Sequence, residues 1–170
     1  MNLNLTKMQG TGNDYIFANL LDVGDSEIFD EMNWSQMAIR LSDRHFGIGS
    51  DGLIFICPSD IADCRMRMFN ADGSEGAMCG NGIRCLGKYV YDHGKTEKVN
   101  LLIETDAGLY RLQLIKKEDT DRICSVRVDM GTPDFVPEHI SARFLLFRPV
   151  CVSMGNPHCV LFVESREAMM

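Results

Sequence analysis

The sequence predicts an α+β fold made of short strands and two helices. Polar and apolar residues alternate along several short runs, which is typical of strands with one buried face. Two other segments carry apolar residues three, four or seven positions apart, which places them on one face of an amphipathic helix. Strands and helices do not alternate regularly, so a doubly wound parallel sheet, in which a helix follows each strand, is disfavoured.

The N-terminal segment is predicted to be a strand that runs into a glycine-rich turn. Leu3 and Leu5 fall on one face of this strand and polar residues fall on the other. The turn covers residues 9–14 and leads into an apolar stretch, Tyr15–Ala18.

The first helix is predicted around residues 34–41, where one face carries Trp34, Met37, Ala38 and Leu41. Asn33 suits the N-cap, because its side-chain oxygen can accept from a free backbone N–H of the first turn. The helix should stop before a second glycine turn at residues 47–52, which feeds an apolar strand at residues 53–57.

A second helix is predicted after the most glycine-rich part of the chain. A strand at residues 64–68 precedes a loop that runs from Asn70 to Gly82. Beyond this loop, Gly94 is placed to end a helix whose apolar face is marked by Ile83, Leu86, Val90 and Tyr91.

The remainder of the chain is predicted to be strands. Two of them cover residues 99–104 and 109–115, and three more follow at residues 123–129, 144–153 and 159–163. The charged run 116–122 between these groups carries both signs, as a hairpin tip or a connection between domains does.

The composition and charge of the chain argue against several classes of function. The 170 residues carry a net charge of −7, a poor match for nucleic acid or an anionic membrane surface. No apolar run approaches the roughly 20 residues that span a bilayer, and the start of the chain has no signal-peptide pattern. The seven cysteines include no C-x-x-C pair, so we expect reduced thiols in a cytoplasmic protein, with no metal site.

Cys79 has the most informative surroundings of these cysteines. It stands in a Cys-Gly-Asn-Gly turn that opens onto the second predicted helix, whose first-turn N–H groups form an anion site. Glycines let a ligand approach the backbone, and a helix N-terminus stabilises a thiolate. A carboxylate held by these N–H groups would place its α-carbon beside the sulfur. That geometry suits removal of an α-proton and also nucleophilic catalysis, and the loop alone does not separate the two.

Asparagines in the glycine turns are further candidate contacts. Asn13, Asn70 and Asn81 are most simply explained as caps of their own turns, but together they also suit a zwitterionic ligand. Asn156 lies near His158, and a lone histidine is more often structural than catalytic. The glycine turns lack the spacing of nucleotide-binding loops.

Four regions of the sequence resemble the diaminopimelate epimerase family, whose members interconvert LL- and meso-diaminopimelate without a cofactor. The matching residues are Met8–Tyr15, Arg44–Gly52, Phe69–Ser74 with Cys79–Cys85, and Val152–Cys159. The resemblance implies a curved, mostly antiparallel sheet wrapped around a central helix, with a second similar domain. It also implies two thiols on opposite faces of Cα: a thiolate removes the proton and a thiol returns one, without pyridoxal phosphate.

The resemblance assigns catalytic roles to two residues of this chain. Cys79 matches one of the two catalytic thiols, and His158 matches a histidine that tunes the thiol pair. Gly80 and Asn81 match the backbone amides that hold the α-carboxylate of the substrate.

Other positions match contacts to the substrate. Asn13, Asn70 and Asn156 correspond to polar contacts. Gly52 stands where some family members carry a substrate-contacting glutamine, so that contact is not expected here.

The chain departs from the family pattern in its second thiol. Family members carry it in a Cys-Gly-Thr-Gly-type loop near the end of the second domain, and no other cysteine here precedes Gly-x-Gly. We expect a first domain over residues 1–122 and the opening strands of an incomplete second domain over residues 123–170. The predicted isomerase, of lysine and peptidoglycan precursor biosynthesis, would be inactive as this chain alone. We expect it to form a homodimer or to associate with a complementary C-terminal half.

Three alternatives stay open at this point. The chain could be a non-catalytic module that binds an amino acid or a partner, or a related cofactor-independent racemase acting on another amino acid. A redox-sensing thiol is disfavoured, because the nearest cysteine, Cys85, has no obvious resolving position within the helix.

Overall fold

The computed structural model describes residues 3–22, 33–135, 149–154, 157–163 and 165. The chain divides into two compact units, Met1–Asp129 and Met130–Met170.

The first unit contains one mixed sheet with the strand order β1-β2-β3-β4-β6-β7-β8, and β5 pairs with β4. The parallel pairs are β2–β3 and β4–β6, and the other pairs are antiparallel. This arrangement confirms the α+β class and the mostly antiparallel sheet. The strands are β1 (Leu5–Gly10), β2 (Asn13–Asn19), β3 (Gly52–Cys57), β4 (Cys64–Asn70), β5 (Glu75–Gly76), β6 (Asn100–Thr105), β7 (Gly108–Lys116) and β8 (Ile123–Asp129).

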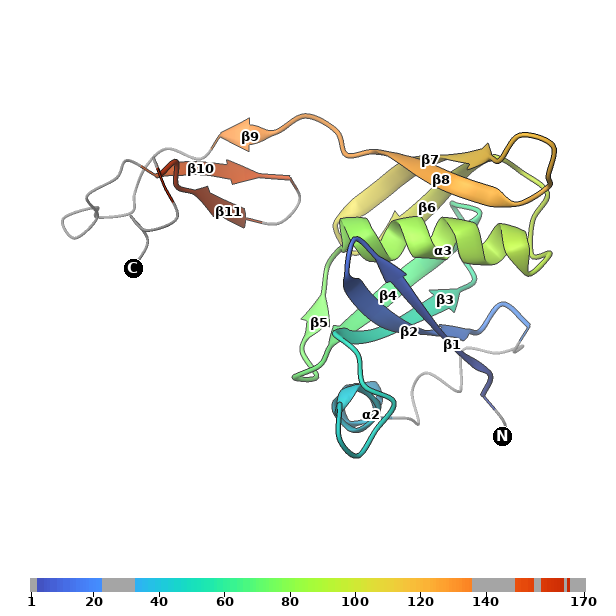
Figure 1. Ribbon diagram of the computed structural model, residues 1–170, viewed down its shortest axis with the longest axis horizontal. Helices are drawn as coiled ribbons and strands as arrows, with labels where there is room; N and C mark the ends of the chain where they lie inside the picture. Colours follow the sequence, from blue (N-terminus) through green and yellow to red (C-terminus); the bar gives the residue numbers. More distant parts are fainter. Residues whose placement is uncertain (1–2, 23–32, 136–148, 155–156, 164, 166–170) are drawn as a thin grey trace. The chain divides into compact units, whose positions relative to one another are not determined.

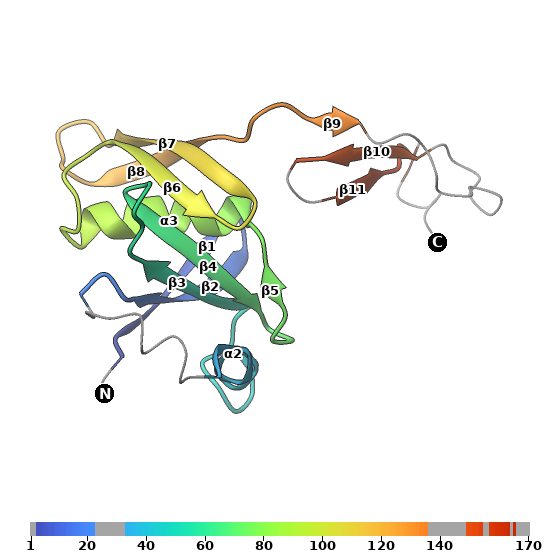
Figure 2. The ribbon, with the colours of Figure 1, turned by 180° about the vertical axis from the view of Figure 1, so that it is seen from behind.

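Helix α3 (Gly80–Asp92) lies inside the curve of this sheet. It packs against both β1 and β8, the two ends of the strand order, so the sheet wraps around it (Figures 1 and 2). Glycines permit the close approach: a Cβ on Gly82 would lie 2.5 Å from Ile54 Cδ1, and one on Gly87 would lie 2.8 Å from Leu112 Cδ2. The central helix implied by the resemblance is therefore present.

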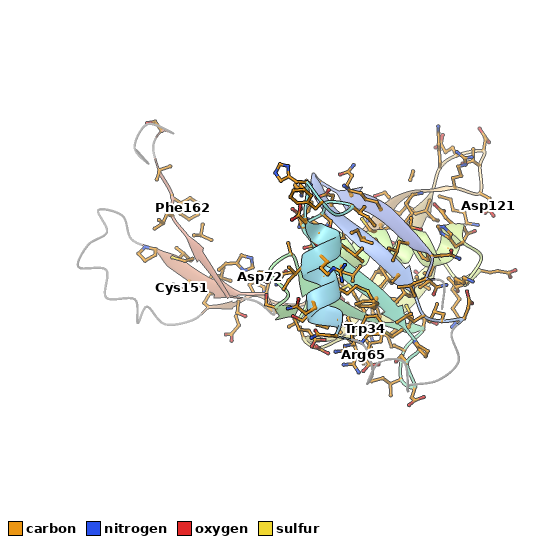
Figure 3. The ribbon with its side chains drawn as sticks, turned by 90° about the horizontal axis from the view of Figure 1, so that it is seen from below. Trp34, Arg65, Asp72, Asp121, Cys151 and Phe162 are labelled. Atoms are coloured by element: carbon orange, nitrogen blue, oxygen red, sulfur yellow. The ribbon has the colours of Figure 1, made fainter. Side chains whose placement is uncertain are left out.

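Helix α2 (Trp34–Ser42) packs against β3 and β4. The Trp34 ring meets Phe55 of β3 edge-on, with ring centroids 4.4 Å apart, and Figure 3 labels Trp34 on this helix. On the opposite face of the sheet, Phe17 of β2 stacks on Tyr89 of α3. Because helices cover both faces, β2 and β3 are buried on both sides, which explains their continuous apolar sequences.

Asn33 caps α2 as predicted. Its Oδ1 accepts a hydrogen bond from the backbone N–H of Gln36 at 3.0 Å. We expect Asn33→Ala to lower the free energy of unfolding by about 1 kcal/mol, because a first-turn N–H loses its acceptor. Urea denaturation measures the change. Asn33→Asp keeps the acceptor and serves as the control, and an alanine variant as stable as the parent would contradict the assignment.

The N-terminal hairpin is tighter than predicted. The turn expected over residues 9–14 is confined to Thr11 and Gly12, with φ of 58° and 87°. The flanking residues pair as strand neighbours, Gln9 with Asp14 and Gly10 with Asn13. Positive φ at both central residues is typical of the type I′ turn, whose twist matches that of the two strands. Asn13 therefore starts β2 instead of lying in a loop.

The loop expected between Asn70 and Gly82 is also shorter than predicted. Asn70 is the last residue of β4, β5 lies within the segment, and α3 begins at Gly80. Gly94, with φ of 65°, follows the end of α3 as predicted.

The division between the units differs from the predicted boundary after residue 122. Strand β8, which was assigned to the second domain, pairs with β7 from Lys116–Ile123 to Arg111–Asp129. Lys88 of α3 also holds β8, since its Nζ donates to the carbonyl of Ile123 at 2.7 Å. The charged run 116–122 is therefore a hairpin connection inside the first unit.

The second unit contains a small antiparallel sheet with the order β11-β10-β9. Its strands are β9 (Asp134–Phe135), β10 (Val150–Ser153) and β11 (Pro157–Val160). Strands β10 and β11 overlap the predicted runs 144–153 and 159–163, although residues 144–148 lie outside the described residues; β9 was not predicted. That this unit opens a second epimerase-like domain stays a prediction. Within the described ranges, no helix is long and apolar enough to cross a membrane.

Candidate functional site

Cys79 is the N-cap residue of α3. Its backbone is extended, with φ of −135° and ψ of 114°, and its Sγ accepts from the backbone N–H of Gly82 at 3.3 Å. The apolar face of the helix fixes this position, because Ile83 and Leu86 are fully buried under the sheet. The half-buried sulfur is therefore held at the positive end of the helix dipole.

Two backbone amides beside the sulfur have no acceptor among the residues that the structure describes. The N–H groups of Gly80 and Asn81 belong to the first turn of α3, and no described residue accepts from them. Unsatisfied first-turn N–H groups form an anion site. A carboxylate bound there would lie next to the Cys79 sulfur.

Strand β2 supplies two side chains to the same sulfur. Cys79 Sγ lies 3.5 Å from Tyr15 Oη and 4.0 Å from Asn13 Nδ2. Burial raises the pKa of Tyr15, and the neighbouring Cys79 acts in the same direction. The phenol therefore stays protonated at neutral pH and can donate to a thiolate. Three polar groups surround the sulfur: the Gly82 N–H and the Asn13 amide donate to it, and the Tyr15 hydroxyl accepts from its thiol form.

Arg84 joins the hairpin tip to the first turn of α3. One guanidinium nitrogen donates to the Gly80 carbonyl at 3.0 Å. The other donates to Asn81 Oδ1 at 2.5 Å and to Thr11 Oγ1 at 3.0 Å. Arg84 thus occupies the side-chain oxygen of Asn81, and the backbone N–H of Asn81 is left without an acceptor among the described residues.

Asn70 lies two strands away from Tyr15. The strand register places Tyr15 beside Gly52, and Gly52 beside Asn70. The Asn70 amide nitrogen donates to Ser74 Oγ at 3.0 Å. A Cβ on Gly52 would lie 2.2 Å from the Phe69 carbonyl oxygen, so this backbone leaves no room for the glutamine that some family members carry there.

An ion-pair cluster fixes the start of β2. Arg44 donates to both carboxylate oxygens of Asp14, at 2.7 and 3.1 Å, and to Asp51 at 2.8 Å. Lys7 lies 3.0 Å from Asp14. The hydrogen bond from Arg44, followed by that from Lys7, holds the pKa of Asp14 well below its usual value of 3.8.

This cluster should make stability depend on pH in a defined direction. Since the pKa of Asp14 is lowered by folding, its ion pairs stabilise the folded state above about pH 4, and the stabilisation is lost as the pH falls below that value. Arg44→Met should unfold at a lower urea concentration than the parent at pH 7, with a difference that shrinks toward pH 3. Arg40→Met, at an exposed arginine of α2, is the control. A difference that is constant with pH would contradict the role given to Asp14.

The structure brings together four of the site residues predicted from sequence: Asn13, Cys79, Gly80 and Asn81. His158 is an exposed residue of β11 in the second unit, and Asn156 lies outside the described residues. Among the residues that the structure describes, no group of three or more His, Cys, Asp or Glu side chains could hold a metal ion.

Sequence reasoning missed Tyr15 and Arg84. The spacing of each from a predicted site residue could have identified it. Tyr15 is two residues after Asn13 and therefore shares its strand face. Arg84 follows Gly80 by four residues, one helical turn along α3.

Comparison with known proteins places this chain in a family. The sequence profile described as diaminopimelate epimerase matches residues 5–136. The chain belongs to the diaminopimelate epimerase family. The resemblance drawn from the four sequence regions is thereby confirmed.

Individual members of this epimerase family are similar in sequence to this chain over nearly its whole length. The diaminopimelate epimerase of Agathobacter rectalis is 48% identical, and that of Desulfovibrio desulfuricans is 46% identical, each over 95% of this chain. The match covers 61% of the length of either relative.

Solved structures show that the fold extends beyond the diaminopimelate epimerases. A hydroxyproline epimerase from Agrobacterium vitis, crystallised with trans-4-hydroxy-L-proline, superposes with a TM-score of 0.66 at 15% identity. That likeness covers 94% of this chain and 51% of the other. At this identity it shows the shared fold alone.

Proposed function

We propose that this chain forms the Cys79 half of a diaminopimelate epimerase that interconverts LL- and meso-diaminopimelate. The observation that carries the proposal is the environment of one sulfur. Cys79 Sγ is within reach of donors from α3 and β2, beside two backbone amides that have no acceptor among the described residues. A base and a carboxylate site are thus adjacent.

The proposed reaction starts with the substrate carboxylate on the Gly80 and Asn81 N–H groups. The Cys79 thiolate then removes the α-proton: the Cα–H bond breaks, an S–H bond forms, and the electron pair moves toward the carboxylate. The fixed amides stabilise the developing charge without reorganising, which is the main source of catalysis in such sites. A thiol on the opposite face returns a proton to Cα and inverts the centre.

The second thiol is proposed to come from a complementary C-terminal half. No other cysteine of this chain precedes Gly-x-Gly, the context that surrounds Cys79. Asn13 and Asn70 are proposed as polar contacts to the substrate, together with Asn156. His158 is proposed to tune the thiol pair. The 170-residue chain alone should therefore show negligible epimerisation, because it lacks an acid for the far face.

A hybrid protein tests the proposal. This chain is continued into the C-terminal part of the Agathobacter rectalis relative, beyond the matched region. We expect the hybrid to convert LL- to meso-diaminopimelate and to exchange the α-proton with deuterated water, while the chain alone does not turn over. A folded hybrid that binds diaminopimelate without exchange would overturn the proposal and indicate a binding module. Faster turnover of another amino acid would contradict the assignment of diaminopimelate as the substrate.

A further inference from the structure

We propose that Tyr15 is a positioning residue whose hydroxyl donates a hydrogen bond to the Cys79 thiolate and thereby stabilises the base. The inference rests on the proposed role of Cys79 and goes beyond the residues that the resemblance assigns. Its basis is the arrangement of three groups, Asn13, Tyr15 and Cys79, at the start of β2 and of α3.

The neighbouring amide leaves the hydroxyl proton available to a thiolate at Cys79. Asn13 Nδ2 donates to Tyr15 Oη at 3.4 Å, and the hydroxyl lies 3.5 Å from Cys79 Sγ. An amide N–H cannot accept a hydrogen bond, so the single proton of the phenol points away from Asn13. The sulfur is the other partner of this hydroxyl: the Cys79 thiol donates to it, and once the sulfur has lost that proton the phenol proton can take its place in the same contact.

The ring is held so that the hydroxyl cannot move away. Tyr15 is only 5% exposed, and it lies beside Gly52 in the parallel pair β2–β3. The Cβ that Gly52 lacks would lie 3.1 Å from Tyr15 Cε1. The ring therefore occupies space that a side chain at residue 52 would take.

The groups around the pair keep the phenol protonated. Burial raises the pKa of Tyr15, and the charges of Cys79 and Asp51 oppose its ionisation further. From α3, the sulfur receives the N–H of Gly82, and Cys85 and Arg84 lie on the same helix. Tyr15 therefore keeps the proton that it would donate to a thiolate.

Tyr15→Phe removes the hydroxyl and keeps the ring. The experiment follows the reaction of each cysteine with 2,2′-dithiodipyridine between pH 5 and pH 10, with acid quenching, pepsin digestion and mass spectrometry. We expect the pH midpoint of the Cys79 reaction to rise by about one unit, a tenfold smaller thiolate fraction at low pH. A thiolate whose pKa is one unit higher is about threefold more nucleophilic than the parent thiolate. The rate should thus fall about threefold below the midpoint and rise about threefold at the high-pH plateau.

Opposite changes at the two ends of the profile separate this role from simple damage to the fold. Tyr110→Phe, at a buried tyrosine of β7, is the matched control and should leave the Cys79 profile unchanged. The buried Cys57 and Cys64, whose pKa values burial raises to about 12, should stay unlabelled in every folded variant. An unchanged midpoint in folded Tyr15→Phe would overturn the inference. Failure of the hybrid to exchange the α-proton would overturn the proposed function and leave this result standing.

Discussion

Cys79→Ala is expected to abolish epimerisation and α-proton exchange by the hybrid protein. The substitution removes the proposed base while leaving the proposed carboxylate site on α3, so diaminopimelate should still bind. General base catalysis contributes about 10² to 10⁴-fold, and no neighbouring side chain can replace the thiolate, so we expect a loss of about a thousandfold or more. The measurement is the incorporation of deuterium from the solvent at Cα, followed by mass spectrometry.

Two further variants make this result specific. Cys124→Ala removes an exposed thiol on β8 and should keep the activity of the parent. Cys79→Ser keeps a hydroxyl at the N-cap, so α3 should stay capped while exchange is lost, because a hydroxyl is a far weaker acid than a thiol. Exchange by Cys79→Ala at a rate near that of the parent would remove Cys79 from the mechanism.

The second large effect is expected at Gly52. A Cβ at this residue would lie 2.2 Å from the Phe69 carbonyl oxygen and 3.2 Å from Asn70 Cα, both backbone atoms of the paired strand β4. Backbone cannot yield as a flexible side chain does, so Gly52→Ala must displace β3 from β4. We expect a loss of about 2–3 kcal/mol in the free energy of unfolding, in the upper range for overpacked core positions. Urea denaturation of the 170-residue chain measures it.

Gly76→Ala is the matched control for this prediction. Its Cβ would meet only the side chain of Met68, at 3.1 to 3.3 Å, and a methionine side chain can move. This variant should lose less than about 1 kcal/mol. If Gly52→Ala were equally mild, the strands would have to separate more easily than the structure indicates.

Local sequence patterns predicted most of the secondary structure because they depend on neighbouring residues. The spacing of Trp34, Met37, Ala38 and Leu41 marked α2, and Asn33 marked its start. The Cys-Gly-Asn-Gly turn located the N-terminus of α3 and singled out Cys79 among seven cysteines. The turn predicted over residues 9–14 is longer than the observed turn at Thr11 and Gly12. Glycine content indicates a turn but does not specify which residues pair across it.

Long-range pairing was less accessible to sequence reasoning. Strand β8 was assigned to a second domain because the charged run before it suits a linker as well as a hairpin tip. Its true partner is β7, and its other contact is α3, far back in the chain. Whether the charged run is a linker or a hairpin tip depends on where β8 packs. The surface against which it packs, made by β7 and α3, forms only when the sheet curves around the helix.

The sequence by itself determined the α+β class, the family and the candidate thiol, since each depends on patterns within short segments and not on contacts between them. Only the tertiary structure decided what surrounds that thiol. Tyr15 and Asn13 lie more than sixty residues from Cys79 in sequence, and they meet its sulfur because β2 passes beside the N-terminus of α3. The physical reason is that hydrogen bonds to a thiolate act over a few ångströms, whereas sequence spacing specifies distance only within one helix or strand.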